Sequence, residues 1–213
     1  MKAMVMKATG GREMLQYAER PEPVAGPGQA LVEIAFAGVN FMDIGVRQGI
    51  AWTEMPNPKI LGVEGAGRVI AVGPGVEGVE PGQRVAWVYA PGSYAQRIAI
   101  PANSLVPIPD AVDDRTAASV MMQGLTASHF ATDFYPVQPG DIAFVHAAAG
   151  GLGLLLTQII KLRGRHCHRP RLFDRQGGGR ESGRRGSRHR GWGGRVRRGN
   201  APPDGRRRRA CRL

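Results

Sequence analysis

The chain has 213 residues and a formal net charge of +12, a balance that by itself would favour a nucleic-acid partner. Residues 165–213 carry 17 of the 29 Lys and Arg and 3 of the 17 Asp and Glu, a local charge of +14, which leaves −2 for residues 1–164. This distribution excludes a uniformly basic nucleic-acid-binding fold for the first 164 residues.

The positions of the cysteines and the character of the N-terminus indicate the cellular compartment of the protein. Cys167 and Cys211 both lie in the basic segment, so residues 1–164 offer neither a disulfide nor a thiolate metal ligand. The N-terminus has no continuous apolar segment, and no apolar run approaches the length of a membrane span. We therefore expect a soluble cytoplasmic protein with no membrane partner.

The first 109 residues have the pattern of a β domain. Short apolar runs bounded by turn residues predict strands at 3–8, 30–39, 67–73 and 84–89. Pro-Gly pairs recur between these runs at irregular spacing. This pattern favours a small irregular β-barrel over a repeat array.

The apolar period then changes. Residues 113–134 repeat apolar side chains at helical spacing, and Asp113 and Asp114 favour a helix start. A strand follows at Ile142–His146, then the small-residue turn AAAGGLG at Ala147–Gly153, and then an apolar helix. The order strand, glycine turn, helix is that of a dinucleotide-binding domain.

The turn matches the dinucleotide fingerprint at Ala148, Gly150 and Gly153. Small residues there allow a tight turn, close approach to a pyrophosphate and close packing of helix on strand, while the helix N-terminus offers free N–H groups to phosphate. The alternative interpretation is that small residues merely let a buried helix pack on a strand. The residue that would select NADPH or NADH, about 20 positions onward, falls in the basic segment.

Four further residues have competing interpretations. Asn40 can donate and accept hydrogen bonds without charge, yet in isolation it is typical of a turn. Asp43 and Arg47 are four residues apart, the spacing of a helical ion pair worth about 0.3–0.5 kcal/mol. His146 after an apolar strand is more often a core residue than a reacting one.

Five motifs together carry a family resemblance. GDIAFVHAAAGGLGLLLTQIIK at 140–161 is accompanied, in family order, by GVNFMDIGVRQG at 38–49, LGVEGAGRV at 61–69, GSYAQ at 92–96 and MMQGLTA at 121–127. Residues 1–164 thus resemble quinone oxidoreductases of the zeta-crystallin type, among the zinc-free medium-chain dehydrogenases and reductases.

The resemblance implies an α/β fold in three parts. These are a GroES-like β-barrel at 1–120, the first strand and helix of an NAD(P)-binding Rossmann domain at 121–164, and a basic, non-family tail at 165–213 that we expect to be disordered. It also implies NADPH as the cofactor, bound between barrel and Rossmann domain, a quinone or enone as the substrate, and a homodimer whose surface would lie largely beyond residue 164.

The resemblance also assigns residues. Asn40 and Asp43 would be catalytic and lie near nicotinamide and substrate; cofactor contacts would come from Asn40, Gln123, Thr126, Ala148, Ala149, Gly150, Gly151, Leu152 and Gly153. Gly45 stands where the family usually has Tyr. The zinc-dependent relatives have a Cys in the segment matching 38–40 and a His at Val63, so we expect no metal, and a quinone accepts hydride without a Lewis acid.

Family-like sequence stops after Gly164, which suggests truncation or a frameshift: read one base later, His166–Arg169 can encode Thr-Val-Ile-Gly, a plausible second Rossmann strand. A Rossmann sheet of one strand cannot cover its apolar faces, so we expect the chain to be impaired or inactive. The rival function is an Arg/Gly-rich arm at 165–213 that binds nucleic acid nonspecifically.

Overall fold

The computed structural model describes residues 1–54, 59–163, 166–168 and 210–212, the last two segments by their backbone alone. Contacts divide the chain into two units, Met1–His129 and Phe130–Leu213. This boundary falls later than residue 120, where the sequence placed the end of the barrel domain. The predictions of disorder and nucleic-acid binding for the tail rest on residues that lie largely outside the described segments.

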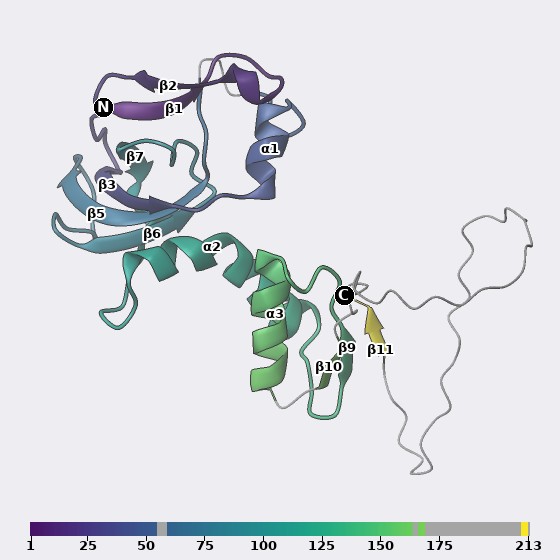
Figure 1. Ribbon diagram of the computed structural model, residues 1–213. Coiled ribbons are helices and arrows are strands. Elements are labelled where there is room, and N and C mark those ends of the chain that lie inside the picture. The colour runs from purple at the N-terminus through teal and green to yellow at the C-terminus, as the bar shows by residue number, and fades with distance from the viewer. Residues whose placement is uncertain (55–58, 164–165, 169–209, 213) are drawn as a thin grey trace, which may run out of the picture. The chain divides into compact units, whose positions relative to one another are not determined.

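The first unit is built from two antiparallel sheets (Figure 1). One has the order β2-β1-β4, formed by Leu15–Glu19, Lys2–Met6 and Lys59–Ile60. The other has the order β7-β3-β5-β6-β8, formed by Arg97–Pro101, Gln29–Ala37, Glu64–Val72, Arg84–Val88 and Val106–Pro107. A bridge between Ala3 and Ala95 connects β1 to the segment before β7. The predicted barrel is confirmed.

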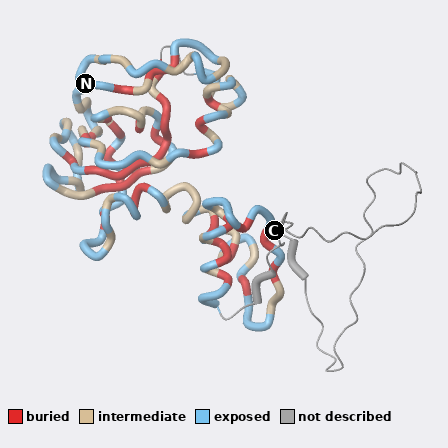
Figure 2. The backbone as a smooth tube through the Cα atoms, in the orientation of Figure 1, coloured by how far each residue is buried: buried red, intermediate tan, exposed pale blue. Residues whose placement is uncertain are grey.

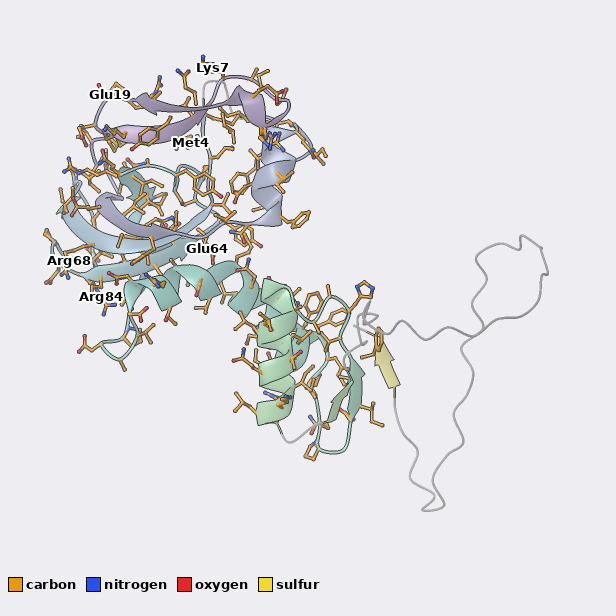
Figure 3. All side chains as sticks on the ribbon, viewed as in Figure 1. Met4, Lys7, Glu19, Glu64, Arg68 and Arg84 are labelled. Atoms are coloured by element: carbon orange, nitrogen blue, oxygen red, sulfur yellow. The ribbon has the colours of Figure 1, made fainter. Side chains whose placement is uncertain are left out.

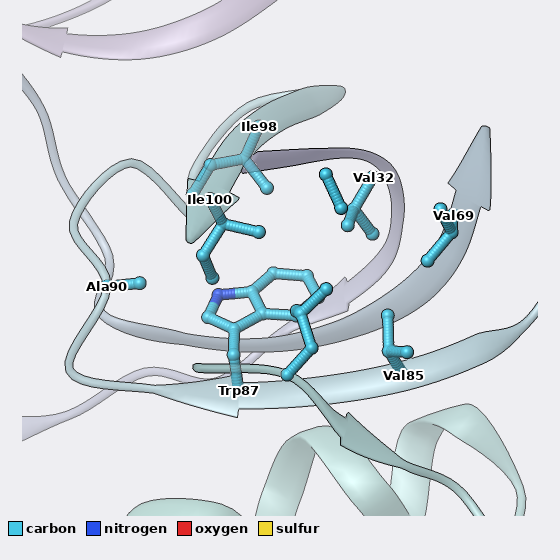
Figure 4. Close-up of a cluster of buried hydrophobic side chains, with 9 residues drawn as sticks. Val32, Val69, Val85, Trp87, Ala90, Ile98 and Ile100 are labelled. Carbon is cyan, nitrogen blue, oxygen red and sulfur yellow. The ribbon is translucent and has the colours of Figure 1, made fainter. Parts of the chain in front are cut away.

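The barrel core forms because the strands alternate apolar residues toward one side. In β3, Ala30 and Val32 are fully buried and meet Trp87 of β6 (Figure 4). The Trp87 indole is the largest fully buried side chain of the unit, and its Nε1 donates to Ser93 Oγ at 2.9 Å. The one polar atom of this aromatic core is therefore satisfied without water.

Helix α2 (Asp114–His129) covers β5 and β6 through small side chains. Ala117 and Ala118 of the helix pack on Ala66 and Ala86 of the sheet, and all four residues are buried, whereas most of α2 is intermediate or exposed (Figure 2). Because alanine carries only a methyl group, the helix backbone approaches the sheet closely. Atoms of the α2 backbone thereby come within hydrogen-bond distance of side chains from the barrel.

The start of α2 gives a pH-dependent prediction. The Thr116 N–H donates to Asp113 Oδ1 at 2.6 Å, and hydrogen bonds from the Thr116 backbone and side chain lower the pKa of Asp113. A depressed pKa stabilises the fold above the unfolded value of 3.8, and this contribution is lost as the pH falls through the folded value. We expect Asp113→Ala to lower the urea midpoint at about pH 7 and to have a smaller effect at about pH 3. Equal effects at both pH values would contradict this.

In the described part of the second unit, a short parallel sheet lies beside the helix α3 (Gly151–Leu162). After the π-helical turn η3 (Phe130–Phe134), β9 (Ile142–Phe144) leads through the glycine turn into α3. Strands β10 (His166–His168) and β11 (Ala210–Arg212) pair with β9 on either side, both in parallel. The sequence predicted β9 and α3 but not these two three-residue strands. In the described part of the chain, no helix has the length and apolar character that crossing a bilayer requires.

Candidate functional site

Asn40 and Asp43 begin the short helix α1 (Phe41–Arg47). Asn40 is the N-cap residue, with extended backbone at φ −121° and ψ 151°. Its N–H donates to Asp43 Oδ2 at 2.8 Å, and the Asp43 N–H donates back to the Asn40 carbonyl at 3.1 Å. These two hydrogen bonds fix the backbone between Asn40 and Asp43. The turn that the sequence predicted at Asn40 is the first turn of helix α1.

A buried carboxylate organises the side chains around Asn40. Glu64, the first residue of β5, is 1% exposed (labelled in Figure 3). Its Oε2 accepts from Asn40 Nδ2 and its Oε1 from the Met122 backbone N–H, each at 2.8 Å. Gln123 Nε2 in turn donates to Asn40 Oδ1 at 2.6 Å. Both ends of the Asn40 amide are thus held, which fixes its orientation.

Gly38 leaves the space that this carboxylate occupies. A Cβ at this position would lie 2.2 Å from Glu64 Oε2 and 2.8 Å from the Ala118 carbonyl oxygen. The Gly38 N–H also donates to the Glu64 carbonyl at 3.0 Å. Glycine is therefore required here for close approach rather than for an unusual backbone conformation.

Asp43 pairs with a tyrosine instead of the predicted arginine. The Tyr94 hydroxyl donates to Asp43 Oδ2 at 2.7 Å, whereas Arg47 Nη1 donates to the Gly10 carbonyl at 2.7 Å. The sequence prediction of an Asp43–Arg47 ion pair is wrong, because Arg47 reaches across to the loop after β1. Burial, the bond to Asp43 and the negative charges of Asp43 and Glu64 raise the pKa of Tyr94 well above its usual 10.0.

The raised Tyr94 pKa gives a prediction at alkaline pH. A group whose pKa is higher in the folded state stabilises the fold below its unfolded pKa, near 10, and this contribution is lost as the pH rises through the folded value. We expect Tyr94→Phe to be less stable than the wild type at about pH 8 but to lose less stability between about pH 9 and pH 11. Urea midpoints measured across that range test this, and parallel declines would argue against it.

Asn40, Asp43 and Tyr94 open onto a pocket of about 400 Å³. Its remaining lining residues are apolar apart from Arg47: Leu15, Val39, Phe41, Ile44, Arg47 and Leu61. An apolar cavity of this size with a few fixed polar groups is the usual form of a small-molecule site. The polar groups present an amide, a carboxylate, a hydroxyl and the Arg47 guanidinium, which suits orienting an acceptor through hydrogen bonds.

The glycine turn of the second unit is shaped by close contacts. A Cβ at Gly153 would lie 2.4 Å from the Ala147 carbonyl oxygen and 2.6 Å from Ala148 Cα, whereas one at Gly150 would lie 3.3 Å from that same oxygen. Ala147 itself has a positive φ of 49°. Among the described residues, no side chain caps the N-terminus of α3. Small residues and the N–H groups at a helix start are the features that pyrophosphate sites share.

The predicted site residues lie in two places, around Asn40 in the first unit and in the glycine turn of the second unit. Asn40, Asp43 and Gln123 belong to one network, while Thr126 Oγ1 donates to the Met122 carbonyl one turn earlier in α2. The residues predicted to hold the pyrophosphate, 148–153, belong to the second unit.

His146 is exposed, so its interpretation as a core residue is wrong. Side chains alternate along this segment: Ala143 and Val145 are buried, while Phe144 and His146 face outward. Strand β9 ends at Phe144, earlier than the predicted Ile142–His146, and His146 lies in the turn that follows, where it is exposed.

The sequence patterns did not indicate the role of Glu64 or the hydrogen bond from Tyr94 to Asp43. The signal that was present is an acidic residue flanked by small ones in GVEGAG, typical of a buried polar group with close neighbours. Among the described residues, no group of three or more His, Cys, Asp or Glu is placed to hold a metal ion.

Comparison with known proteins relates both units to one group. The alcohol dehydrogenase GroES-like domain family matches residues 26–110. A probable quinone oxidoreductase of Schizosaccharomyces pombe is 37% identical over 159 residues, which cover 74% of this chain and 48% of the relative. The quinone oxidoreductase of Pseudomonas aeruginosa is 37% identical over 164 residues, with coverages of 76% and 50%.

Structural similarity agrees with these matches. The crystal structure of Escherichia coli quinone oxidoreductase complexed with NADPH aligns with a TM-score of 0.75 at 31% identity, and covers 79% of this chain and 52% of that chain. The chain spans about half the length of the curated relatives it matches.

Proposed function

We propose that this chain, which is similar to quinone oxidoreductases of the medium-chain dehydrogenase and reductase group, acts in NADPH-dependent reduction of a quinone or a similarly electrophilic acceptor without a metal ion. The observation that carries the proposal is the apolar pocket with Asn40, Asp43 and Tyr94 in its wall. A planar, largely apolar ring with polar oxygens matches that distribution of apolar and polar groups.

Asn40 is the proposed contact to the acceptor oxygen. Its Nδ2 carries two hydrogens, and one of them is donated to Glu64. The other is free to donate to a carbonyl oxygen, and the bond from Gln123 prevents the amide from rotating. Asp43 supports this arrangement through the backbone of Asn40. A hydrogen bond that strengthens as charge develops on the acceptor oxygen favours the transition state over the ground state.

NADPH, when bound, supplies the hydride. Residues Ala148, Ala149, Gly150, Gly151, Leu152 and Gly153 are the proposed pyrophosphate contacts, because Gly153 permits the close turn and the N–H groups at the start of α3 are uncapped. Gln123 contributes by holding Asn40, and Thr126 is proposed as a further cofactor contact on α2. The glycine turn and Asn40 lie in different units, and each is proposed from its own surroundings.

The proposed reduction of a quinone needs only a hydride from NADPH and a proton from solvent. A quinone that receives a hydride at its ring system moves an electron pair onto a carbonyl oxygen, and a proton from solvent completes the hydroquinone. Gain of aromatic stabilisation drives the step. The protein contributes position and exclusion of water, through Asn40 and the apolar wall of the pocket.

The test is NADPH oxidation by the full chain with menadione, a naphthoquinone, compared between Asn40→Leu and the exposed Asn103→Leu. Loss of a hydrogen bond to the developing charge is expected to lower kcat/KM by about 10–100-fold in Asn40→Leu, and Asn103→Leu should match the wild type. Quenching of tryptophan fluorescence by menadione reports acceptor binding independently of turnover. A folded Asn40→Leu variant with unchanged kcat/KM would falsify the assignment of Asn40. Absence of menadione binding by the wild type would contradict the assignment of the pocket as the acceptor site.

A further inference from the structure

Asp43 also lines a second, much smaller cavity. This cavity has a volume of about 10 Å³ and is walled by α1, β4 and the segment after β4, with Lys59 on its surface. Most of the other lining groups are apolar: Val46, Trp52, Ile60, Leu61, Gly62, Val63 and Pro91. A cavity of about 10–15 Å³ is the size that holds a single water molecule.

Two buried polar groups line this cavity, and among the described residues one of them has no hydrogen-bond partner and the other has a single long contact. Asp43 is 5% exposed, and its Oδ1 accepts no hydrogen bond from any described residue. Lys59 is also 5% exposed, and within the described segments its Nζ has one contact, at 3.4 Å to the Trp52 carbonyl oxygen. The two side chains do not form a direct ion pair within 4.0 Å.

Such an arrangement is costly if the cavity is dry. A buried ammonium and a buried carboxylate oxygen without full hydrogen bonding lose much of their hydration, and nearly all buried polar groups in proteins have a partner. A water molecule has two donors and two acceptor sites, so it can accept from an ammonium and donate to a carboxylate at once. Buried waters commonly satisfy otherwise unpaired polar groups in this way.

We propose that one water molecule occupies this cavity, accepts a hydrogen bond from Lys59 Nζ and donates one to Asp43 Oδ1. Lys59 is then the water-mediated counter-ion of Asp43, whose other oxygen, Oδ2, accepts from the Asn40 N–H and the Tyr94 hydroxyl. The inference rests on the cavity and its two polar groups, and it stands whichever acceptor the larger pocket binds.

A double-mutant cycle on the full chain tests the coupling. Lys59→Met removes the charge at similar volume, and Asp43→Asn keeps an oxygen for Tyr94 and Asn40 while it turns an NH₂ group toward the cavity. We expect each single variant to lower the urea midpoint and the double variant to lose clearly less than the two single losses combined. Lys7→Met, at an exposed lysine, is the matched control, and it should be additive with Asp43→Asn.

Lys59→Gln extends the test if Lys59→Met does not fold, because a neutral amide keeps a hydrogen bond to the water but loses the charge; it should show smaller but non-zero coupling. A crystal structure of the full chain should also show a density peak within about 3.2 Å of both Lys59 Nζ and Asp43 Oδ1. Additive losses in the cycle, or an empty cavity at high resolution, overturn the proposal. Neither measurement depends on catalysis, so failure here is distinguishable from failure of the proposed reduction.

Discussion

Replacing Glu64 with leucine should destabilise the barrel unit by about 2–6 kcal/mol. Leucine removes both acceptor oxygens while the Asn40 Nδ2 and Met122 N–H donors stay buried, and each unsatisfied donor costs about 1–3 kcal/mol. The exposed Glu19→Leu is the matched control and should stay within about 0.5 kcal/mol of the wild type. Figure 3 marks both positions. Urea unfolding gives the comparison when it is followed by tryptophan fluorescence in a Trp192→Phe background, where Trp52 and Trp87 both belong to the barrel unit.

Glu64→Gln should be much milder than Glu64→Leu. A glutamine can accept from the Met122 N–H through its oxygen and turn its NH₂ toward Asn40. Asn40 then presents its oxygen if its amide flips, and Gln123 can flip in turn to accept from the Asn40 NH₂. The chain of amides thus reverses direction and remains satisfied. A loss in Glu64→Gln as large as that in Glu64→Leu would show that charge, and not hydrogen-bond count, holds the network.

Replacing Gly153 with alanine should displace α3 from the glycine turn. The added Cβ would lie 2.4 Å from the Ala147 oxygen and 2.6 Å from Ala148 Cα, both backbone atoms that cannot rotate away. Overpacking of this kind costs about 1–3 kcal/mol. We expect faster hydrogen exchange of the α3 amides and, where NADPH binds, at least about tenfold weaker binding by NADPH fluorescence.

Gly150→Ala is the control for Gly153→Ala. Its Cβ would lie 3.3 Å from the Ala147 oxygen, and its backbone at φ −78° is open to any residue. A shift of a few tenths of an ångström accommodates the methyl group, so exchange of α3 should stay close to that of the wild type. In a Trp192→Phe background, tryptophan fluorescence should be unchanged in both variants because Trp52 and Trp87 lie in the other unit. Equal effects of the two substitutions would contradict the role assigned to close packing at Gly153.

Local patterns predicted the parts of the fold that local physics determines. Alternation of apolar residues located β3 and β6, and helical spacing together with Asp113 located α2. The small residues of the turn located the start of α3 at Gly151. These elements form from interactions within a few residues, so a sequence displays them directly.

The partners of the site residues were not predictable in the same way. Glu64 is bound by Asn40, 24 residues before it, and by Met122, 58 residues after it. Spacing indicated that Asp43 and Arg47 can meet on a helix, but not that Tyr94 and Gly10 are better placed to bind them. Strands β10 and β11 are three residues each, too short to show a period. Tertiary contacts determine these side-chain partners and these short strands.

The hydrogen bond from Met122 to Glu64 uses the helix backbone, not a side chain. Every amino acid except proline supplies that N–H group, so the attachment of α2 to the barrel places no demand on the side chain at position 122. The constraint on side chains instead concerns the barrel. Position 64 needs an acceptor of the length of glutamate, and position 38 needs a glycine to leave space for it. Substitutions among related chains should therefore be free at 122, apart from proline, and restricted at 38 and 64.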